Sequence, residues 1–290
     1  MAMIAKNTKR NIILAILAVI LAALILWTLW GNTALELNTY VVESENLPER
    51  FSGYRIAHIS DLHNAQMGRD NEKLLAMLRQ AEPDMIAITG DMIDSRNTDV
   101  AIALGFAEEA MKIAPCYYVT GNHEARVAEY AAFKEKLMSL GVIVLANERI
   151  ELEREGQRIA LLGVDDPSFQ TDYLTGDAET VMETGLQALT QEDAAYTVLL
   201  SHRPELFDIY AQNGIDLVLS GHAHGGQIRL PFIGGLAAPN QGIFPKYDAG
   251  LYTSGATQMI VSRGIGNSII PLRFNNRPEV ILIELEQREK

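Results

Sequence analysis

Five of the six histidines lie in short polar strings that follow apolar, β-like runs, and this arrangement constrains the fold more than any other feature. Open α/β sheets place their sites at the carboxyl ends of the strands, so one sheet edge could gather all of these side chains. The strings occur in this order: Asp61-Leu62-His63, Gly90-Asp91, Gly121-Asn122-His123-Glu124, Ser201-His202 and Gly221-His222-Ala223-His224. The pattern predicts a sheet whose strand ends carry a polar cluster.

Strand-like and helix-like segments alternate along the chain. Apolar runs predict strands at 54–60, 85–89, 116–119, 142–145, 197–200, 217–219, 258–262 and 280–285. Apolar residues at helical spacing predict one helix that begins after Asp70 and ends at Pro83. They predict a second helix that begins at Thr98. This alternation favours parallel βαβ units with helices covering the sheet. Residues 149–152 and 158–162 flank a turn and predict an antiparallel hairpin, so we expect a mixed sheet.

The amino-terminal segment is apolar from Ile12 to Trp30 except for Thr28. At 1.5 Å per residue it is long enough to cross a hydrocarbon layer about 30 Å thick. Three basic residues precede it, whereas four glutamates follow it before the first basic residue, Arg50. The positive-inside rule therefore predicts a cytoplasmic amino terminus and an extracytoplasmic domain, with the opposite orientation as the alternative.

An uncleaved anchor fits this segment better than a signal peptide. The apolar stretch of a signal peptide is about 7 to 15 residues long and ends in small residues, whereas this one ends in Trp27 and Trp30. We therefore predict a single-pass protein of the cell membrane. Its expected divisions are a cytoplasmic tail at 1–10, a transmembrane anchor at 11–31, a linker and first strand region at 32–53, and a catalytic domain at 54–290.

Charge and cysteine usage exclude several classes of site. The chain has a formal net charge of −13, which argues against nucleic acid as a partner. An anionic substrate would also be repelled unless local cations, such as metal ions, reverse the field. The single cysteine, Cys116, excludes an internal disulfide and a thiolate metal cluster, and its apolar surroundings predict a buried structural residue.

The residue types in the strings are those that bind divalent metals. Asp61 and His63 are two residues apart, so an extended chain points both toward one ion. Gly90 allows the tight turn that would bring Asp91 between two ions. Imidazole, carboxylate and amide ligands without thiolate suit Mn, Fe or Zn. The sixth histidine, His58, lies three residues before Asp61, so its side chain points to the other face of the strand. It is therefore expected to be a core residue.

These residues together resemble the signature of the calcineurin-like metallophosphoesterases. The matching blocks are Asp61-x-His63, Gly90-Asp91-x-x-Asp94, Gly121-Asn122-His123-Glu124, His202 and Gly221-His222-x-His224, between about Arg55 and His224. Segments 225–228, 262–264 and 271–273 are similar to a bacterial membrane-associated branch that includes phosphodiesterases and UDP-2,3-diacylglucosamine pyrophosphohydrolases. The resemblance implies an α/β (α+β) fold, a four-layer αββα sandwich with mixed sheets, here preceded by one transmembrane helix.

The resemblance also implies roles for individual residues. Asp61, His63, Asp91 and His224 would hold the first of two divalent ions, and Asp91, Asn122, His202 and His222 the second. His123 would protonate the leaving group, with Asp94 orienting it. Ser95 stands where phosphoprotein phosphatases carry an arginine, so the resemblance does not extend to a phosphate clamp at Arg96. Arg263 and Arg273 are candidates for binding the substrate, with ion pairs inside the fold as the alternative.

The expected reaction is hydrolysis of a phosphodiester or pyrophosphate by a hydroxide held between two ions. The segment 225–250 is rich in Gly and Pro and also apolar, which fits a mouth for acyl chains or contact with the bilayer, unless its side chains form a satellite core. A membrane lipid or lipid-linked substrate is therefore favoured. The alternatives are a soluble nucleotide, phosphoprotein or wall polymer, or an anchored metal-binding scaffold without catalysis, and the oligomeric state stays open.

Overall fold

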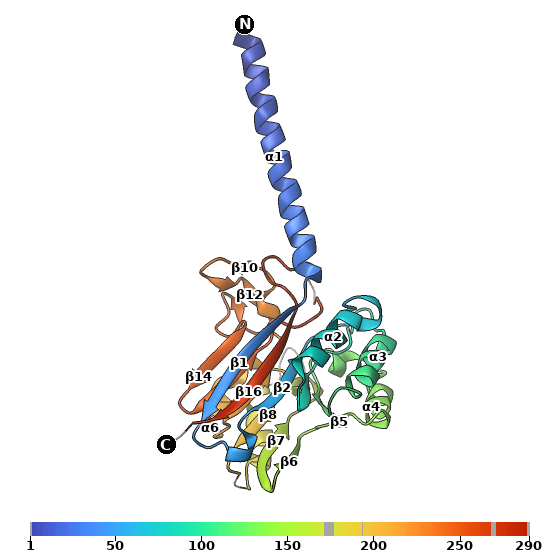
Figure 1. Ribbon diagram of the computed structural model, residues 1–290, viewed down its shortest axis with the longest axis vertical. Coiled ribbons are helices and arrows are strands. Elements are labelled where there is room, and N and C mark those ends of the chain that lie inside the picture. Colours follow the sequence, from blue (N-terminus) through green and yellow to red (C-terminus); the bar gives the residue numbers. More distant parts are fainter. Residues whose placement is uncertain (1, 171–176, 193, 268–270, 289–290) are drawn as a thin grey trace.

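A long helix, α1 (Ala2–Thr33), extends away from a layered α/β domain in the computed structural model, which describes residues 2–170, 177–192, 194–267 and 271–288 (Figure 1). Within these residues, the segment from Lys9 to Thr33 is the one helix long and apolar enough to cross a membrane. Its large apolar side chains are exposed on every side, as expected for a helix whose partner is lipid rather than the domain. The predicted anchor at 11–31 lies inside this helix.

Two mixed sheets of six strands form the centre of the domain. The first has the order β1 (Glu36–Ser44), β16 (Glu279–Gln287), β2 (Tyr54–Ile59), β3 (Met85–Thr89), β4 (Cys116–Val119) and β5 (Ile143–Val144). Only the β16–β2 pair is antiparallel in this sheet. The second has the order β14 (Gly250–Ser254), β15 (Thr257–Val261), β9 (Leu217–Ser220), β8 (Thr197–Leu200), β7 (Gln157–Gly163) and β6 (Glu148–Arg154). Its outer pairs are antiparallel, and β6–β7 is the predicted hairpin.

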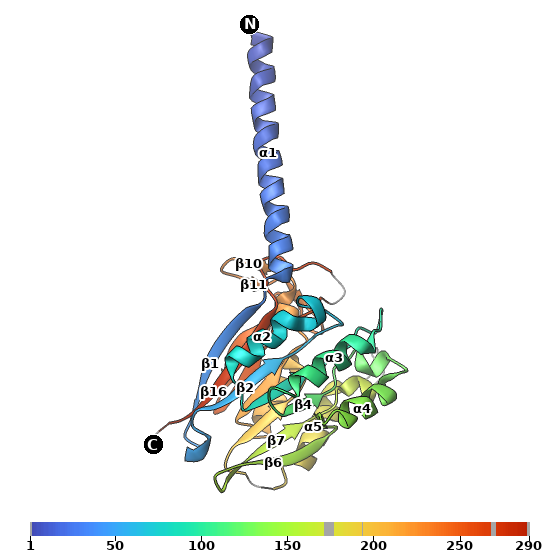
Figure 2. The ribbon, with the colours of Figure 1, turned by 45° about the vertical axis from the view of Figure 1, so that its right-hand side comes forward.

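Among the described residues, five α-helices cover the outer faces of the two sheets (α2 to α5 labelled in Figure 2, α6 in Figure 1). They are α2 (Glu72–Ala81), α3 (Val100–Ala110) and α4 (Tyr130–Ser139) on the first sheet, and α5 (Ala178–Leu189) and α6 (Phe207–Gln212) on the second. The two predicted helix starts were too early, the first by one residue and the second by two. Asp70 and Asn71 both have positive φ and so precede α2, and the carboxylate of Asp99 caps α3 by accepting the N–H of Ala101 at 3.1 Å.

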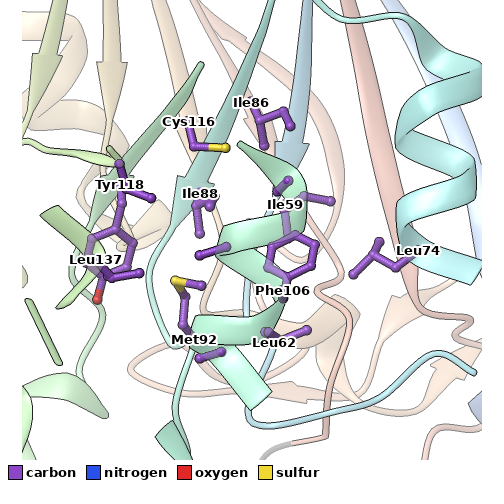
Figure 3. Close-up of a cluster of buried hydrophobic side chains, with 14 of the residues drawn as sticks. Ile59, Leu62, Leu74, Ile86, Ile88, Met92, Phe106, Cys116, Tyr118 and Leu137 are labelled. Atoms are coloured by element: carbon purple, nitrogen blue, oxygen red, sulfur yellow. The ribbon is translucent and has the colours of Figure 1, made fainter. Parts of the chain in front are cut away.

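Three apolar clusters separate the four layers. Side chains from α2, α3 and α4 meet the first sheet around Leu74, Phe106 and Tyr118 (Figure 3). A second cluster fills the space between the sheets, and a third lies under α5 and α6. Because side chains alternate along a strand, Ile59 of β2 faces the helices whereas Ile56 faces the second sheet. The αββα sandwich is therefore confirmed.

Segment 32–53, predicted as a linker with a first strand, contributes β1 to the first sheet. β1 pairs in parallel with β16 over its whole length, from Glu36 opposite Glu279 to Ser44 opposite Gln287. β16 is antiparallel to β2, so β1 and β16 begin at the edge where β2, β3 and β4 end. Since β1 follows α1 directly, α1 joins the domain at this carboxyl-terminal edge (Figure 1).

Hydrogen bonds fix the base of α1 to the domain. The side chain of Asn32 donates to the carbonyl of Arg273 and accepts from its backbone N–H, both at 2.9 Å. The guanidinium of Arg277 donates to the carbonyls of Ala34 and Leu35 at 2.8 and 2.9 Å and lies 4.8 Å from the ring centre of Trp30. The anchor therefore leaves the domain from a defined point.

We expect Gly90→Ala to destabilise the domain more than Gly156→Ala. Both glycines have positive φ, +84° and +81°, so each substitution carries the same penalty of about 1–2 kcal/mol for a left-handed L-residue. A Cβ at Gly90 would also lie 2.5 Å from the backbone nitrogen of Gly121, whereas Gly156 has no neighbour within 4 Å. Thermal unfolding should show a Tm lower by several °C for Gly90→Ala than for Gly156→Ala. Equal losses would mean that the close approach of the two loops is not important.

Candidate metal centre

The seven side chains predicted to bind metal converge at the carboxyl-terminal edge of the two sheets, and all are buried. They follow β2, β3 and β4 of the first sheet and β8 and β9 of the second. Their ligand atoms form two groups, Asp61, His63, Asp91 and His224 in one and Asp91, His202 and His222 in the other. Asn122 lines the same small cavity as Asp91 and His222. The ligand assignments stay predictions, but the grouping is the one they require.

Asp91 stands between the two groups. Its Oδ2 lies 3.4 Å from Nε2 of His63 and 3.3 Å from Nε2 of His202, while its Oδ1 accepts the backbone N–H of His123 at 2.8 Å. One oxygen is thus held by the backbone and the other faces a histidine of each group. This is the geometry that a carboxylate shared by two ions needs.

The first group closes around Asp61. Nε2 of His224 lies 3.2 Å from Oδ1 of Asp61 and 3.2 Å from Nε2 of His63. The other oxygen of Asp61 accepts the backbone N–H of His222 at 3.0 Å. Two imidazole nitrogens and a carboxylate oxygen therefore converge on a common point, and they come from both sheets.

Buried polar atoms without partners show that the residues fit divalent ions. Nδ1 of His202 lies 2.7 Å from the carbonyl of Thr89, which fixes the ring; Nε2 faces Oδ2 of Asp91 at 3.3 Å but forms no hydrogen bond with the described residues. Oδ1 of Asn122 is likewise buried without such a partner. Unpaired buried polar atoms are costly, and an ion would pair both. The donor set is nitrogen and oxygen only, since Cys116 lies in the helix-facing core.

Burial and the neighbouring carboxylates shift the pKa values of the histidines in this centre in opposite directions. Burial lowers the pKa of His202, but Asp91 outweighs burial and raises that pKa to about 10. Burial dominates at His224 and lowers its pKa to about 3, so that ring stays neutral. Because a metal ligand must be a neutral imidazole, ion binding would displace the proton from His202. Burial also lowers the pKa of His58, the histidine predicted to be a core residue, to about 3. Nε2 of His58 lies 2.7 Å from Oγ1 of Thr89.

His123 belongs to neither of these two groups, but it forms a third possible group with His63 and Asp94 beside them. Its Nδ1 accepts the backbone N–H of Ser95 at 3.0 Å, so a neutral ring carries its proton on Nε2. Asp94 is beside the ring, 3.5 Å from Nδ1, but its carboxylate mainly binds Arg96, at 2.8 and 3.1 Å. His123, Arg96 and Arg126 line a cavity of about 110 Å³ together with the metal-site residues.

The structure places the other two arginine candidates inside the fold. Arg263 forms ion pairs of 2.9 and 2.7 Å with Glu36 and Glu279. Arg273 is fully buried and donates to the carbonyls of Arg263 and Gly266. These contacts support the alternative role, in which both arginines hold the loops that connect β15 to β16.

Glu124, the last residue of the third polar string, connects two loops in the structure. Its buried carboxylate accepts the backbone N–H groups of Asp91 at 2.9 Å, Gly121 at 2.8 Å and Ile93 at 3.3 Å. Burial, with a contribution from Asp91, raises its pKa to about 7. Glu124 therefore ties the loop after β3 to the loop after β4. Its position as the last residue of the Gly121-Asn122-His123-Glu124 string was the available signal.

Arg203 and Asn240 are two further residues that the sequence did not reveal. Arg203 forms a buried ion pair with Asp166, at 2.9 Å from Nη2 to Oδ1, and lowers the pKa of that carboxyl to about 2 against the opposing effect of burial. Oδ1 of Asn240 accepts from Nη1 of Arg203 at 2.9 Å and lies 3.0 Å from Nε2 of His222. Such contacts fix the ring plane and tautomer of a metal-binding histidine.

We expect Asn240→Ala to weaken metal binding by about 10- to 100-fold, because His222 would lose the group that orients its ring. Asn275→Ala is the matched control, since Asn275 is exposed and has a positive φ of 51°, close to the 58° of Asn240. Competition with a chromophoric chelator would measure both affinities. An affinity loss equal in the two variants would contradict a specific role for Asn240.

Comparison with known proteins agrees with this geometry. A family model described as calcineurin-like phosphoesterase matches residues 54–226. The chain is 30% identical to the uncharacterized metallophosphoesterase YkuE of Bacillus subtilis, over 87% of this chain and 86% of that protein. It is 27% identical to the phosphodiesterase YaeI of Escherichia coli, over 80% of this chain and 82% of that protein.

Two further comparisons concern the anchor and the fold. A transmembrane protein with metallophosphoesterase domain from Danio rerio is 32% identical over 84% of this chain, which spans 55% of that protein. The crystal structure of TT1561 of Thermus thermophilus has a TM-score of 0.51 at 14% identity, over 74% of this chain and 91% of that one. The helix and the named transmembrane relative together favour a single-pass membrane protein.

Proposed function

The chain belongs to the calcineurin-like phosphoesterase family and is a hydrolase acting on phosphoesters, and from this premise we propose that it cleaves a phosphodiester or pyrophosphate in a membrane lipid or lipid-linked precursor. One observation carries the choice of substrate. The helix α1 joins the domain at the sheet edge that gathers the candidate metal ligands. An anchored enzyme with its centre at that edge has the bilayer as its nearest source of phosphoester.

The residues of the chain have distinct proposed roles. Two divalent ions held by the seven ligands, with Mn, Zn or Fe as candidates, would supply a water of lowered pKa and polarise the phosphoryl oxygens. His123 lines the cavity, and its proposed role is to give its Nε2 proton to the leaving oxygen, with Ser95 and Asp94 beside its Nδ1. Arg126 and Arg96, the latter paired with Asp94, line the same cavity and are the basic residues proposed to face the phosphoryl group of the substrate.

We expect the full chain in detergent micelles to hydrolyse lipid phosphodiesters or lipid pyrophosphates with at least a tenfold higher kcat/KM than soluble aryl and nucleotide esters. His123→Ala is the control that assigns the activity to this centre. It should keep the metal content of the parent protein and lose about 100-fold or more in kcat, because a general acid contributes about 10²–10⁴. Equal or better turnover of the soluble esters would overturn the lipid proposal, and unchanged turnover by His123→Ala would overturn the role of His123.

The proposed orientation has the amino terminus in the cytoplasm and the domain outside, because basic residues precede the anchor and acidic ones follow it. A reporter enzyme that folds only outside the cytoplasm, fused at the carboxyl terminus, should therefore be active in intact cells. Activity of a cytoplasm-only reporter at the same position would reverse the orientation. That result would favour a cytoplasmic biosynthetic substrate instead of an outer-leaflet lipid.

A further inference from the structure

We propose that two short hairpins form a membrane-docking surface that enters the lipid head-group region beside the anchor. The hairpins are β10 (Arg229–Leu230) with β11 (Gly234–Gly235), and β12 (Ala237–Ala238) with β13 (Gly242–Ile243). The docking surface consists of Phe232, Ile233, Ile243 and Phe244. The inference rests on the proposed attachment of the chain to a bilayer, and it does not depend on which phosphoester is cleaved.

The four side chains are exposed to an unusual degree and lie close together in the sequence. Phe232 is exposed to 108% of its reference area, Ile243 to 72%, Ile233 to 63% and Phe244 to 57%. The alternative of a satellite core is wrong for these four, although Ala238 and Tyr247 of the same segment do pack into the third cluster. Single exposed apolar residues are ordinary, whereas a gathered set of large ones marks an interaction site.

The backbone holds both phenylalanines in a costly conformation. Phe232 has a φ of +68° and Phe244 a φ of +56°, in the left-handed region that bulky residues rarely adopt. Glycine or asparagine would occupy such turn positions with less strain. Strain kept at an exposed aromatic residue points to a function for that side chain. Here the function that fits is contact with an apolar medium.

The docking surface lies at the end of the domain from which α1 leaves, as both ribbon views show for β10 (Figures 1 and 2). A short path of hydrogen bonds connects the two. The backbone N–H of Arg229 in β10 donates to the carbonyl of Phe274 at 3.0 Å, and the adjacent Arg273 is bonded to Asn32 of α1. Trp27 and Trp30, residues typical of membrane interfaces, occupy the same end of α1. The bilayer is therefore the occupant that this position favours.

The second hairpin also reaches the metal centre. Asn240 lies in the turn between β12 and β13, where its Oδ1 contacts His222 and Arg203, while Ile243 and Phe244 of the same hairpin face outward. One short segment thus has the candidate metal ligands on one side and the docking surface on the other. Docking would bring the cavity lined by His123 and Asn240 close to the head groups.

The test uses the full chain in lipid nanodiscs with a polarity-sensitive fluorophore attached at Phe232→Cys or Phe244→Cys. Cys116 is fully buried, so the new cysteine is the reactive one. Met138→Cys on α4 is the matched control, because Met138 is also apolar and is 56% exposed. We expect nitroxide lipids to quench the labels at 232 and 244 at least twofold more than the label at 138, with a blue shift of their emission.

Each other outcome overturns the docking surface. Equal quenching at all three sites would show that the hairpins stay in water. A blue shift without quenching by lipid would show that a protein surface, such as a second copy of this chain, covers the hairpins instead.

A second variant separates docking from catalysis. Phe232→Ser combined with Phe244→Ser should raise KM for a phosphoester presented in vesicles about tenfold and leave kcat/KM for a soluble ester unchanged. A loss on both substrates would mean that the hairpins only support the fold, which overturns the inference. Quenched labels together with a preference for soluble esters would confirm docking while the proposed lipid substrate fails.

Discussion

The buried carboxylate of Asp91 is the constraint on which the rest of the structure depends. An ionised carboxylate inside a protein needs hydrogen bonds and compensating charge. The N–H of His123 holds Oδ1, and His63 and His202 face Oδ2 from two different sheets. The two sheets must therefore meet at this edge with little freedom. Gly90 and Gly121 allow that approach, since a Cβ at Gly121 would overlap with the side chain of Asp91.

Charged residues behind the candidate ligands hold the loops that carry those ligands. Glu124 fixes the loops that present Asp91 and Asn122, and Arg203 with Asp166 supports the loops of the second sheet near His222. Buried ion pairs of this kind add little net stability over apolar packing, but removing one partner alone is strongly destabilising because it leaves an unpaired buried charge. Their value here is geometric, because they hold ligand loops from separate strands in one arrangement whether or not an ion is bound.

The sequence predicted the parts of this centre that follow a local rule. Ligands such as Asp61 and His202 stand directly after apolar strands, so strand alternation and parallel pairing bring them together. Arg273 had no local signal, because a buried arginine that binds carbonyl groups looks the same in sequence as one that binds phosphate. Asn240 lies 18 residues beyond His222, in a turn whose path depends on tertiary packing. The helix starts predicted at Asp70 and Thr98 were too early. Positive φ values at Asp70 and the next residue delay the start of α2, and the cap of α3 is Asp99.

One reversal of strand direction has the largest consequence for function. Had β16 run parallel to β2, β1 would have begun at the opposite edge of the sheet, and α1 would have joined the domain at the end away from the candidate metal ligands. The antiparallel β16–β2 pair instead puts the end of α1, the ligand loops and the two hairpins at one end of the domain. Two contacts of the described residues between β15 and β16 lie at that end: the N–H of Gly266 donates to the carbonyl of Asp61 at 2.7 Å, and the carbonyl of Arg273 accepts from Asn32 of α1 at 2.9 Å. The helix α1 and the candidate centre are thus connected through one set of contacts, and this connection is the basis of the proposal that the substrate is a phosphoester in the membrane.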